Sequence, residues 1–521
     1  MKTKLLLVSM LLIAVGTVKA ATFVVANLTY EKIDDGTCRL VGHDTKALEI
    51  VVPETVTHEE HTYRVTEIGF KALSNPDLTS VTLPDGLTVI GESAFDDCRA
   101  LSSVTIPGTV TKIEKSAFWG CFGLKSVVIP NSVTEVGEKA FSNCIFLSSV
   151  TLSEQLTVIK EQTFSNCPVL SSVTIPNSVT EIGGYAFGGC DGLTSLTIPA
   201  GVKEIGEAAF MFCRGLTSLT VSEGVTLIGE QAFENCVGLT SVTLPSSVKT
   251  IDTGAFKSCI HLNSVTLSEG VTEIGSIAFS GCSSLTSIAI PASITSIAGN
   301  AFYSCSGLTS IEVASDNNSY SSSDGVLFDK ARKTLVIYPS GKRNSSYTVP
   351  DAVTAIGEGA FFDCGHLASV TISGSVTAIG NSAFQNCYVM KDIYCLAQTP
   401  PAISLSTFES YSATLHVPEG CMPAYKAAEN WKNFKKIVEG GESAIDHLDV
   451  DSSIVYHAGI LSLPDSDVPA TVYVYTQDGK CVWTCPMAVG ERACDLSPLA
   501  QGIYLVRVKT GNETACLKIV R

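Results

Sequence analysis

The sequence predicts a β-rich repeat solenoid, made of short parallel strands with few short helices, and a small C-terminal β-sandwich-like domain. A phrase such as LSSVTIPNSVTEIGGYAFGGC, at residues 170–190, recurs along most of the chain. Within each copy apolar and polar residues alternate over four positions, which is typical of a half-buried strand. Beyond residue 440 the phrase stops, and short strand patterns separated by Asp-Gly and Gly-Asn turns follow.

Length, composition and charge agree with this fold and argue against two classes of partner. A chain of 521 residues exceeds one globular core, so several domains or a repeat array are expected. The hydrophobic content of 45% indicates folded protein rather than disorder. The net charge of −17 argues against nucleic acid and anionic membrane surfaces, because both require a basic footprint.

Residues 1–20 have the pattern of a secretory signal peptide. Lys2 and Lys4 precede an apolar stretch from 5 to 15, and small residues up to Ala20 form a cleavage site. The apolar stretch is shorter than the roughly 20 residues that a membrane-spanning helix requires. We therefore expect export without a transmembrane segment, to the cell surface or the medium, or to the periplasm.

Phenylalanine marks the period of the repeat. A spacing of 23 residues holds along a run of copies and resumes after a single insertion. A fixed period in this range is typical of a leucine-rich-repeat-like solenoid, a right-handed superhelix in which no rung can bury its apolar face alone. The phenylalanines are Phe95, Phe118, Phe141, Phe164, Phe187, Phe210, Phe233, Phe256, Phe279, Phe302, Phe361 and Phe384.

One rung shows how the apolar residues are distributed. The alternation over residues 172–175 predicts a short strand with one buried face, and Pro176 ends it because proline cannot donate to a strand ladder. Serine and threonine take the outward positions of this strand. The apolar residues of the rung are expected to form the repeat core: Leu170, Val173, Ile175, Phe187 and Cys190.

The cysteines follow the same period, three residues after each phenylalanine. Equivalent side chains on neighbouring rungs are parallel and about 4.8 Å apart, whereas a disulfide requires converging Cβ atoms about 3.8 Å apart. A linear row also cannot surround a tetrahedral metal ion. We expect buried, inert thiols at Cys98, Cys121, Cys144, Cys167, Cys190, Cys213, Cys236, Cys259, Cys282, Cys305, Cys364 and Cys387.

The phrase L-x-S-V-T-I-P-x-x-V-T-x-I-G-x-x-A-F-x-x-C resembles the BspA-type bacterial leucine-rich repeat, also called the treponemal subtype. The resemblance covers residues 78–390. An insertion at 314–349, with strands expected around 325–328 and 334–338, looks like the hairpin insertion often found in this family.

The segments on either side of the repeats are expected to be caps. Residues 21–77 carry short strand patterns and end in a degenerate first unit, which predicts an N-terminal cap that shields the first rung. Residues 391–439 depart from the repeat and contain helix formers around Tyr425 and Trp431, which predicts a C-terminal cap with a short helix. The Gly-Gly-Glu-Ser stretch at 440–443 is interpreted as a linker.

Residues 445–521 are interpreted as a separate small β-domain. They resemble the C-terminal sorting tail of Bacteroidetes type IX secretion, through VYVYTQDGK at 472–480, LAQGIYLVRV at 499–508 and the basic terminus at Arg521. The resemblance implies delivery to the cell surface. Three interpretations stay open for the cysteines of this domain, namely one or two disulfides, unpaired thiols or a zinc site: Cys481, Cys485, Cys494 and Cys516.

No motif predicts an enzyme. His58-Glu59-Glu60-His61 has its histidines three apart in a strand-rich context, whereas a zinc protease places them four apart on one helix. No nucleophile elbow, phosphate loop or dinucleotide-binding motif lies between a strand and a helix. We therefore expect a protein without enzymatic activity, bound metal or cofactor.

The repeat leaves few residues for recognition. Serine and threonine on the outward strand face either suit a solvated surface or dock a partner through shallow hydrogen bonds. Aromatic and arginine side chains, which usually anchor interfaces, occur where the repeat varies, and the insertion is basic. The candidate protein-binding residues are Lys330, Arg332, Lys333, Lys342 and Arg343 in the insertion, and Trp119, Phe122, Tyr185 and Arg214 in the rungs.

The resemblance to the BspA group implies adhesion to host extracellular-matrix or plasma proteins, or to other microbes. Two alternatives stay open. In one, the solenoid is a spacer or cell-envelope scaffold without a dedicated ligand. In the other, it is a carbohydrate-associated surface protein with a glycan as its partner.

Overall fold

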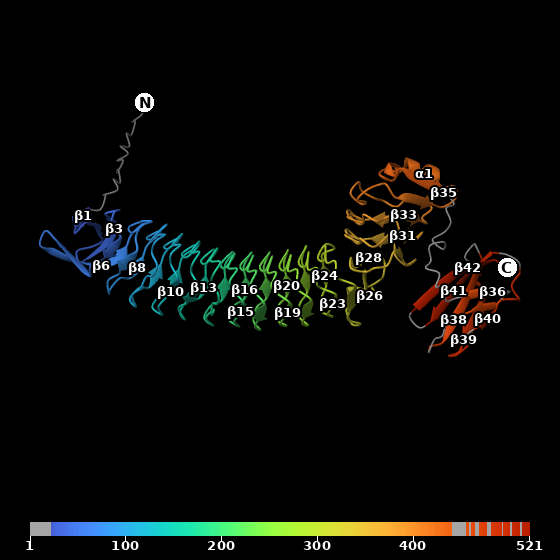
Figure 1. Ribbon diagram of the computed structural model, residues 1–521, viewed down its shortest axis with the longest axis horizontal. Coiled ribbons are helices and arrows are strands. Elements are labelled where there is room, and N and C mark those ends of the chain that lie inside the picture. The colour runs from blue at the N-terminus through green and yellow to red at the C-terminus, as the bar shows by residue number, and fades with distance from the viewer. Residues whose placement is uncertain are drawn as a thin grey trace, which may run out of the picture. The chain divides into compact units, whose positions relative to one another are not determined.

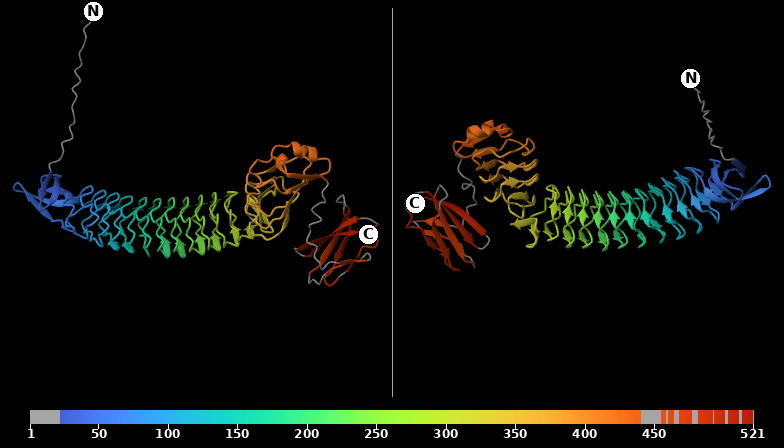
Figure 2. Two further views of the ribbon diagram at one scale, coloured as in Figure 1. Left: turned by 45° about the horizontal axis from the view of Figure 1, so that its top comes forward. Right: turned by 180° about the vertical axis from the view of Figure 1, so that it is seen from behind.

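The computed structural model describes residues 22–439, 455–457, 460–463, 468–476, 481–491, 493–500, 503–510 and 513–520. The predicted signal peptide, the linker at 440–443 and Arg521 lie outside these residues. The chain is a β-solenoid with almost no helix, which confirms the predicted fold class. It divides into two compact units, Met1–Cys305 and Ser306–Arg521 (Figures 1 and 2).

The first unit begins with a small β-structure at the end of the coils. Its strands are β1 (Thr22–Val25), β2 (Leu28–Lys32), β3 (Thr37–His43), β5 (Thr55–His58) and β6 (His61–Ile68). β6 pairs in parallel with β3 on one side and with the first coil on the other, so the hydrogen-bonding edge of that coil is covered. The His58–His61 segment is the turn of the β5–β6 hairpin, not a helix.

Two rows of short strands run along the coils of the first unit (Figure 1). We call the row whose strands begin with serine the serine sheet, and the row of two-residue strands the two-residue sheet. Both are parallel with a register offset of 23 residues between neighbouring rungs. Because the strands are parallel and the offset stays at 23 residues, equivalent residues of successive rungs lie one above another.

The strands of the two sheets are as follows. The serine sheet contains β7 (Ser80–Thr82), which pairs with β4 (Glu49–Val51), and β10 (Ser126–Val128), β12 (Ser149–Thr151), β15 (Ser195–Ile198), β17 (Ser218–Val221), β19 (Ser241–Leu244), β21 (Ser264–Leu267) and β23 (Ser287–Ile290). The two-residue sheet contains β8 (Val89–Ile90), β9 (Lys112–Ile113), β11 (Glu135–Val136), β13 (Val158–Ile159), β14 (Glu181–Ile182), β16 (Glu204–Ile205), β18 (Leu227–Ile228), β20 (Thr250–Ile251), β22 (Glu273–Ile274) and β24 (Ser296–Ile297).

The phenylalanines form a third row, inside the coil. Their rings stack nearly parallel, with centroids 5.4 Å apart for Phe164–Phe187 and 5.3 Å for Phe187–Phe210. The backbone N–H of Phe187 donates to the carbonyl of Ala209 in the next rung at 2.8 Å. The rings are fully buried, so each rung contributes an apolar face that only its neighbours can cover.

The cysteines form a row beside the rings, and all are free and buried, as predicted. Each thiol also donates a hydrogen bond that the sequence did not reveal. Cys190 Sγ donates to the carbonyl of Phe164 at 3.2 Å, and Cys213 Sγ to that of Phe187 at 3.3 Å. The thiol therefore fills volume and also satisfies a buried carbonyl of the preceding rung.

The strand predicted at 172–175 is wrong in extent. Only an isolated bridge between Ser149 and Ser172 forms, and β15 pairs with β17 but not with residues 172–175. Val173, expected in the core, is half-buried. Between Phe141 and Phe302 the rings are 5.3 to 5.6 Å apart. Over these rungs the serine sheet hydrogen-bonds in pairs and opens between them, whereas the two-residue sheet is continuous from β13 to β24.

The second unit begins with β25 (Ser310–Val313) and the insertion. β26 (Tyr320–Ser323), β27 (Val326–Asp329) and β28 (Thr334–Ile337) are antiparallel neighbours. β28 then pairs in parallel with β30 (Ala355–Ile356), and β29 (Ser346–Thr348) pairs in parallel with β31 (Ser369–Ile372). The later part of 314–349 therefore lies within the sheets of the coil.

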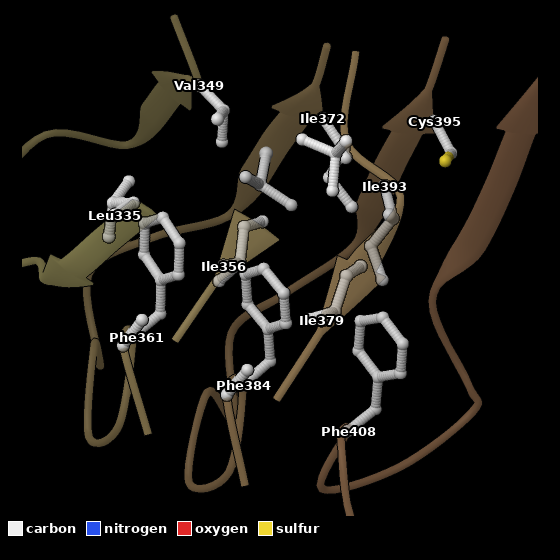
Figure 3. Close-up of a cluster of buried hydrophobic side chains, with 14 of the residues drawn as sticks. Leu335, Val349, Ile356, Phe361, Ile372, Ile379, Phe384, Ile393, Cys395 and Phe408 are labelled. Atoms are coloured by element: carbon white, nitrogen blue, oxygen red, sulfur yellow. The ribbon is translucent and has the colours of Figure 1, made fainter. Parts of the chain in front are cut away.

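Tyr338 occupies the place of a phenylalanine in this unit. Its ring centroid lies 5.1 Å from that of Phe361, and its N–H donates to the carbonyl of Ala360. Figure 3 shows Phe361, Phe384 and Phe408 in one row against the isoleucines of the strands. Their rings are 4.8 and 5.1 Å apart, and here the serine-type sheet is continuous through β29, β31, β33 (Asp392–Cys395), β34 (Thr414–Val417) and β35 (Lys436–Glu439). The remaining two-residue strand is β32 (Ala378–Ile379).

A short helical segment follows the last rings, as predicted for residues 391–439. It contains α1 (Met422–Ala427) and the 3₁₀ turn η1 (Trp431–Asn433). Trp431 Nε1–H donates to the carbonyl of Pro401 at 2.7 Å, and its ring meets Phe408 edge-on. The indole therefore covers the last ring of the row and satisfies its own buried N–H.

The C-terminal domain consists of two antiparallel sheets around one core. The strands of the first sheet are β36 (Val455–His457), β37 (Ile460–Ser462) and β40 (Ala493–Asp495), and those of the second are β38 (Ala470–Thr476), β39 (Cys481–Met487), β41 (Ile503–Thr510) and β42 (Glu513–Val520). Leu461 and Cys494 from the first sheet share a buried cluster with Val472 and Val506 from the second. This arrangement agrees with the expected sandwich-like domain.

Truncating one ring should destabilise the solenoid strongly. We expect Phe210→Ala to lower the free energy of unfolding by about 3–5 kcal/mol, because the cavity lies between two stacked rings. Urea unfolding followed by far-ultraviolet circular dichroism measures this. The exposed Ser218→Ala in the serine sheet is the control, with a change within about 0.5 kcal/mol. A loss below about 1 kcal/mol for Phe210→Ala would contradict the role of the ring row.

Candidate binding surfaces

The outward face of the serine sheet is almost uniform. Along β15, β17, β19 and β21 the serine and threonine side chains are exposed while the residues between them are buried. Val128 breaks the pattern as an exposed apolar residue. This face offers many hydroxyls but few of the aromatic or arginine anchors that dominate interface energies.

A groove of about 430 Å³ opens in the serine sheet where two rungs are not hydrogen-bonded. Its walls include Val173 and Thr174 from one rung and Ser195 and Thr197 from the next. The groove exposes part of Val173 and the unpaired edge of β15. Its hydroxyls and strand edge can form hydrogen bonds with a peptide backbone or a polyol, but its lining contains no cluster of charged groups.

Most of the basic residues of the insertion are engaged within the insertion itself. Lys330 Nζ donates to the carbonyls of Ser315 and Asn317, and the Arg332 guanidinium to that of Ser322 at 3.2 Å. Such contacts hold the loop in shape and occupy the charged groups. Because the acceptors are neutral carbonyls, the positive charges remain, and both Lys330 and Arg332 are exposed.

The contacts of Lys333 are made by its backbone, whereas Lys342 is held by its side chain. The carbonyl of Lys333 accepts hydrogen bonds from the N–H and hydroxyl of Thr354 in the next rung. Lys342 Nζ binds the carbonyl of Asp324 at 2.7 Å and its carboxylate at 3.1 Å, and its side chain is only 11% exposed. Lys333 and Arg343 are both exposed, and of the five basic candidates they are the best placed to meet a partner.

The four candidates in the rungs do not form one site. Phe122 and Arg214 both follow a cysteine directly, and so belong to one row of the repeat. Trp119, 37% exposed, lies two residues before its cysteine. Tyr185 lies further along the chain, with its hydroxyl 3.5 Å from the Glu207 carboxylate. Burial is the main cause that raises the pKa of the Tyr185 phenol, and the Glu207 carboxylate is the second.

The row that directly follows the cysteines contains an apolar stretch bounded by Arg99 on one side and by Asp191 on the other, with Arg214 one rung further. Arg99 lies over the Phe122 ring at 5.4 Å and is paired with Asp97, and Arg214 lies over Phe212 at 5.1 Å and is paired with Asp191. Between them the edge is apolar over three consecutive rungs. We call this group the edge stripe: Phe122, Ile145, Phe146, Pro168 and Val169.

The edge stripe exposes more apolar surface than the repeat requires. Phe146 is 58% and Val169 42% exposed, at equivalent positions of adjacent rungs. Corresponding positions in other rungs hold glycine, at 192, 215 and 238. Ile145, Pro168 and Val169 were missed from the sequence, although large residues at usually small positions were a usable signal.

The outer side of the two-residue sheet carries paired charges near its N-terminal end. Lys160 Nζ lies 2.6 Å and Lys112 Nζ 3.7 Å from the Glu135 carboxylate, and the hydrogen bond from Lys160 lowers the pKa of Glu135. Because these charges neutralise one another at the surface, they contribute little to stability and present little net charge.

The described residues contain no cluster that could hold a metal. No group of three or more histidine, cysteine, aspartate or glutamate side chains is suitably placed among them. Within the same ranges, no helix has the length and apolar character needed to cross a membrane.

The repeats match the model of a family described as "BspA type Leucine rich repeat region (6 copies)", over residues 66–194, 180–309 and 340–422. No protein of curated function matches the chain. The match covers more than half of the 521 residues.

Several solved bacterial structures are similar to this chain. One is a leucine-rich repeat protein from Bacteroides ovatus, 23% identical over 80% of this chain and 99% of that chain, with a TM-score of 0.46. Another is a leucine rich cell surface protein from Faecalibacterium prausnitzii, 24% identical over 81% and 96%, with a TM-score of 0.32. A leucine rich repeat protein of T. pallidum is 26% identical over 41% and 88%, with a TM-score of 0.30.

The thiol row predicts a loss of stability at alkaline pH. Burial raises the pKa of each thiol from Cys144 to Cys305, to about 12 at Cys144 and Cys259. In the unfolded chain these thiols ionise near their ordinary pKa of about 8.5. The unfolded state then binds fewer protons than the folded state, so the free energy of unfolding falls as pH rises.

Urea unfolding between pH 7 and pH 11 measures this effect. We expect a plateau up to about pH 8 and a progressive fall above about pH 8.5. A Cys190→Ala, Cys213→Ala variant should show a shallower fall, because two raised pKa values are removed. Equal slopes for the variant and the unmodified chain would contradict the assignment.

Proposed function

Because this chain belongs to the family of BspA-type leucine-rich repeat proteins, we propose that it is an exported binding protein of the cell surface. It acts as an adhesin towards host matrix or plasma proteins, or towards other cells. The family gives the repeat-protein class, and the repeat phrase fits its treponemal subtype. Residues 1–20 direct export, and the domain at 445–521 serves as a sorting tail.

The edge stripe carries this proposal. Phe146 and Val169 are exposed on two adjacent rungs, and Phe122 is partly exposed on the rung before them. With Arg99 over the Phe122 ring and Arg214 over the Phe212 ring nearby, this group has the composition of an interface hot spot. The repeat core already uses one phenylalanine per rung. Phe122 and Phe146 are additional and partly exposed, so they are better explained by binding than by folding.

A spacer function is the second candidate, favoured by the serine sheet. Its hydroxyl face repeats without change over many rungs, so it has no position that distinguishes one partner from another. A uniform hydroxyl face would suit a spacer, which needs solubility but no specific partner. The two functions predict different results in a binding assay.

The edge stripe can be tested by paired substitution. We expect Phe146→Ser with Val169→Ser to weaken binding to immobilised fibronectin or fibrinogen at least about 10-fold, because hot-spot side chains each contribute 2 kcal/mol or more. Surface plasmon resonance measures the affinity, and a glycan array tests the carbohydrate alternative. Phe146 is 58% and Val169 42% exposed, and neither belongs to the core, so the fold should be retained.

Two control variants separate the other surfaces. Arg343→Ser tests the insertion without removing β28 and β29, which a deletion of 314–349 would destroy. Ser195→Ala with Ser218→Ala tests the serine sheet. If the unmodified chain binds none of the probes, the adhesin proposal is wrong and the spacer is supported. If only Arg343→Ser weakens binding, the assignment to the edge stripe is wrong.

A further inference from the structure

Two cysteines of the C-terminal domain lie on the edges of its two sheets. Cys485 is on β39, the edge strand of the four-stranded sheet, and Cys494 is on β40, the edge strand of the three-stranded sheet. β39 and β40 are consecutive in sequence. The chain therefore leaves one sheet at Met487 and enters the other at Ala493, turning a corner of the sandwich.

The corner between these strands is tight. The Ala488 N–H donates to the Glu491 carboxylate at 2.8 Å, and the Glu491 N–H donates back to the Ala488 carbonyl at 3.0 Å. This reciprocal pair closes the turn immediately after β39. It holds the ends of the two edge strands near each other, whereas the centres of packed sheets are about 10 Å apart.

Both cysteine side chains face the shared core. Along β39 the side chains at 483, 485 and 487 are more buried than those at 484 and 486, and on β40 only Cys494 is buried. Cys494 belongs to the core cluster and Cys485 packs against it. Burial, and then the neighbouring Cys485 thiol, raise the pKa of Cys494 to about 12.

Cys481 has a different environment although it is on the same strand. A register shift between Val474 and Tyr475 interrupts the pairing of β38 with β39 next to Cys481. Its thiol is exposed and contacts the Thr484 hydroxyl, which is on the outward side. Cys481 is therefore not directed towards Cys494.

We propose that Cys485 and Cys494 form a disulfide that joins the two sheets of the C-terminal domain. The proposal rests on the export included in the proposed function, because disulfides persist in oxidising compartments and not in the cytosol. The bond would tie the corner of the sandwich covalently. The thiols of the phenylalanine repeat stay reduced, since they point in parallel along the row.

The bond forms by thiol–disulfide exchange with a small-molecule or protein disulfide as oxidant. The Cys485 thiolate, on the less buried residue, attacks one sulfur of the oxidant and releases its other sulfur as a thiolate. Cys494 then attacks the Cys485 sulfur and releases the second thiolate. The two protons of the cysteines end on the two released thiols, and the oxidant has accepted two electrons.

Peptide mapping tests the bond directly. Trypsin cleaves after Lys480, Arg492 and Arg507, so Cys485 lies in peptide 481–492 and Cys494 in peptide 493–507. The purified full chain, first reduced, is incubated in a buffer of oxidised and reduced glutathione, alkylated, digested and analysed by mass spectrometry. We expect the two peptides to be joined, and the joined product to disappear on reduction.

Two variants assign the partner. The joined peptide should persist in Cys481→Ser, which shares the first peptide, and be lost in Cys485→Ser. Loss in Cys481→Ser, a bond to peptide 510–518 that contains Cys516, or no bond at all overturns the proposal. The assay is independent of where the cell places the protein. Failed export would instead appear in cell fractionation, where the chain would remain in the cytoplasm.

Discussion

The spacing between the stacked phenylalanine rings is the constraint on which the rest of the first unit depends. Flat rings of this type settle at 5.3 to 5.6 Å over most of the row, and backbone hydrogen bonds from each phenylalanine to the next rung lock that spacing. Paired strands prefer about 4.8 Å. The two-residue sheet nevertheless stays continuous from β13 to β24, whereas the serine sheet pairs two rungs at a time and leaves the groove beside Val173.

The repeated cysteine follows from the same geometry. A carbonyl from the preceding phenylalanine lies buried beside the ring row, and a buried carbonyl without a donor is costly. A thiol donates weakly to it while filling space as a small hydrophobe. Serine would form a stronger hydrogen bond but is less apolar, and alanine would remove this second donor, although the carbonyl of Phe187 would keep the bond from the Cys190 N–H. The residues of the phrase therefore recur because successive rungs must stack on one another, and the positions that vary between rungs are available for binding.

The solenoid, its period and its core could be predicted because apolar residues recur in a fixed register, as from Leu170 to Cys190. The partial burial of Val173 could not be predicted, because it depends on which neighbouring rungs of the serine sheet pair, and the phrase of a single rung does not encode that pairing. Lys330 and Lys342 looked like surface charges, yet their long side chains fold back onto nearby carbonyls. Phe122 and Arg214 were found because aromatic and arginine side chains are conspicuous, whereas Ile145 and Val169 resemble ordinary core residues.

Hydrogen–deuterium exchange of the free protein, resolved to single amides by mass spectrometry, tests the central claim that the ring row holds the rungs together. The account predicts slow and similar exchange at the amides of Phe118, Phe141, Phe164, Phe187 and Phe210, which donate to the next rung. The amides of Ile145, Phe146 and Val169 in the edge stripe should exchange much faster. Exchange at the phenylalanine amides as fast as in the edge stripe would contradict the account.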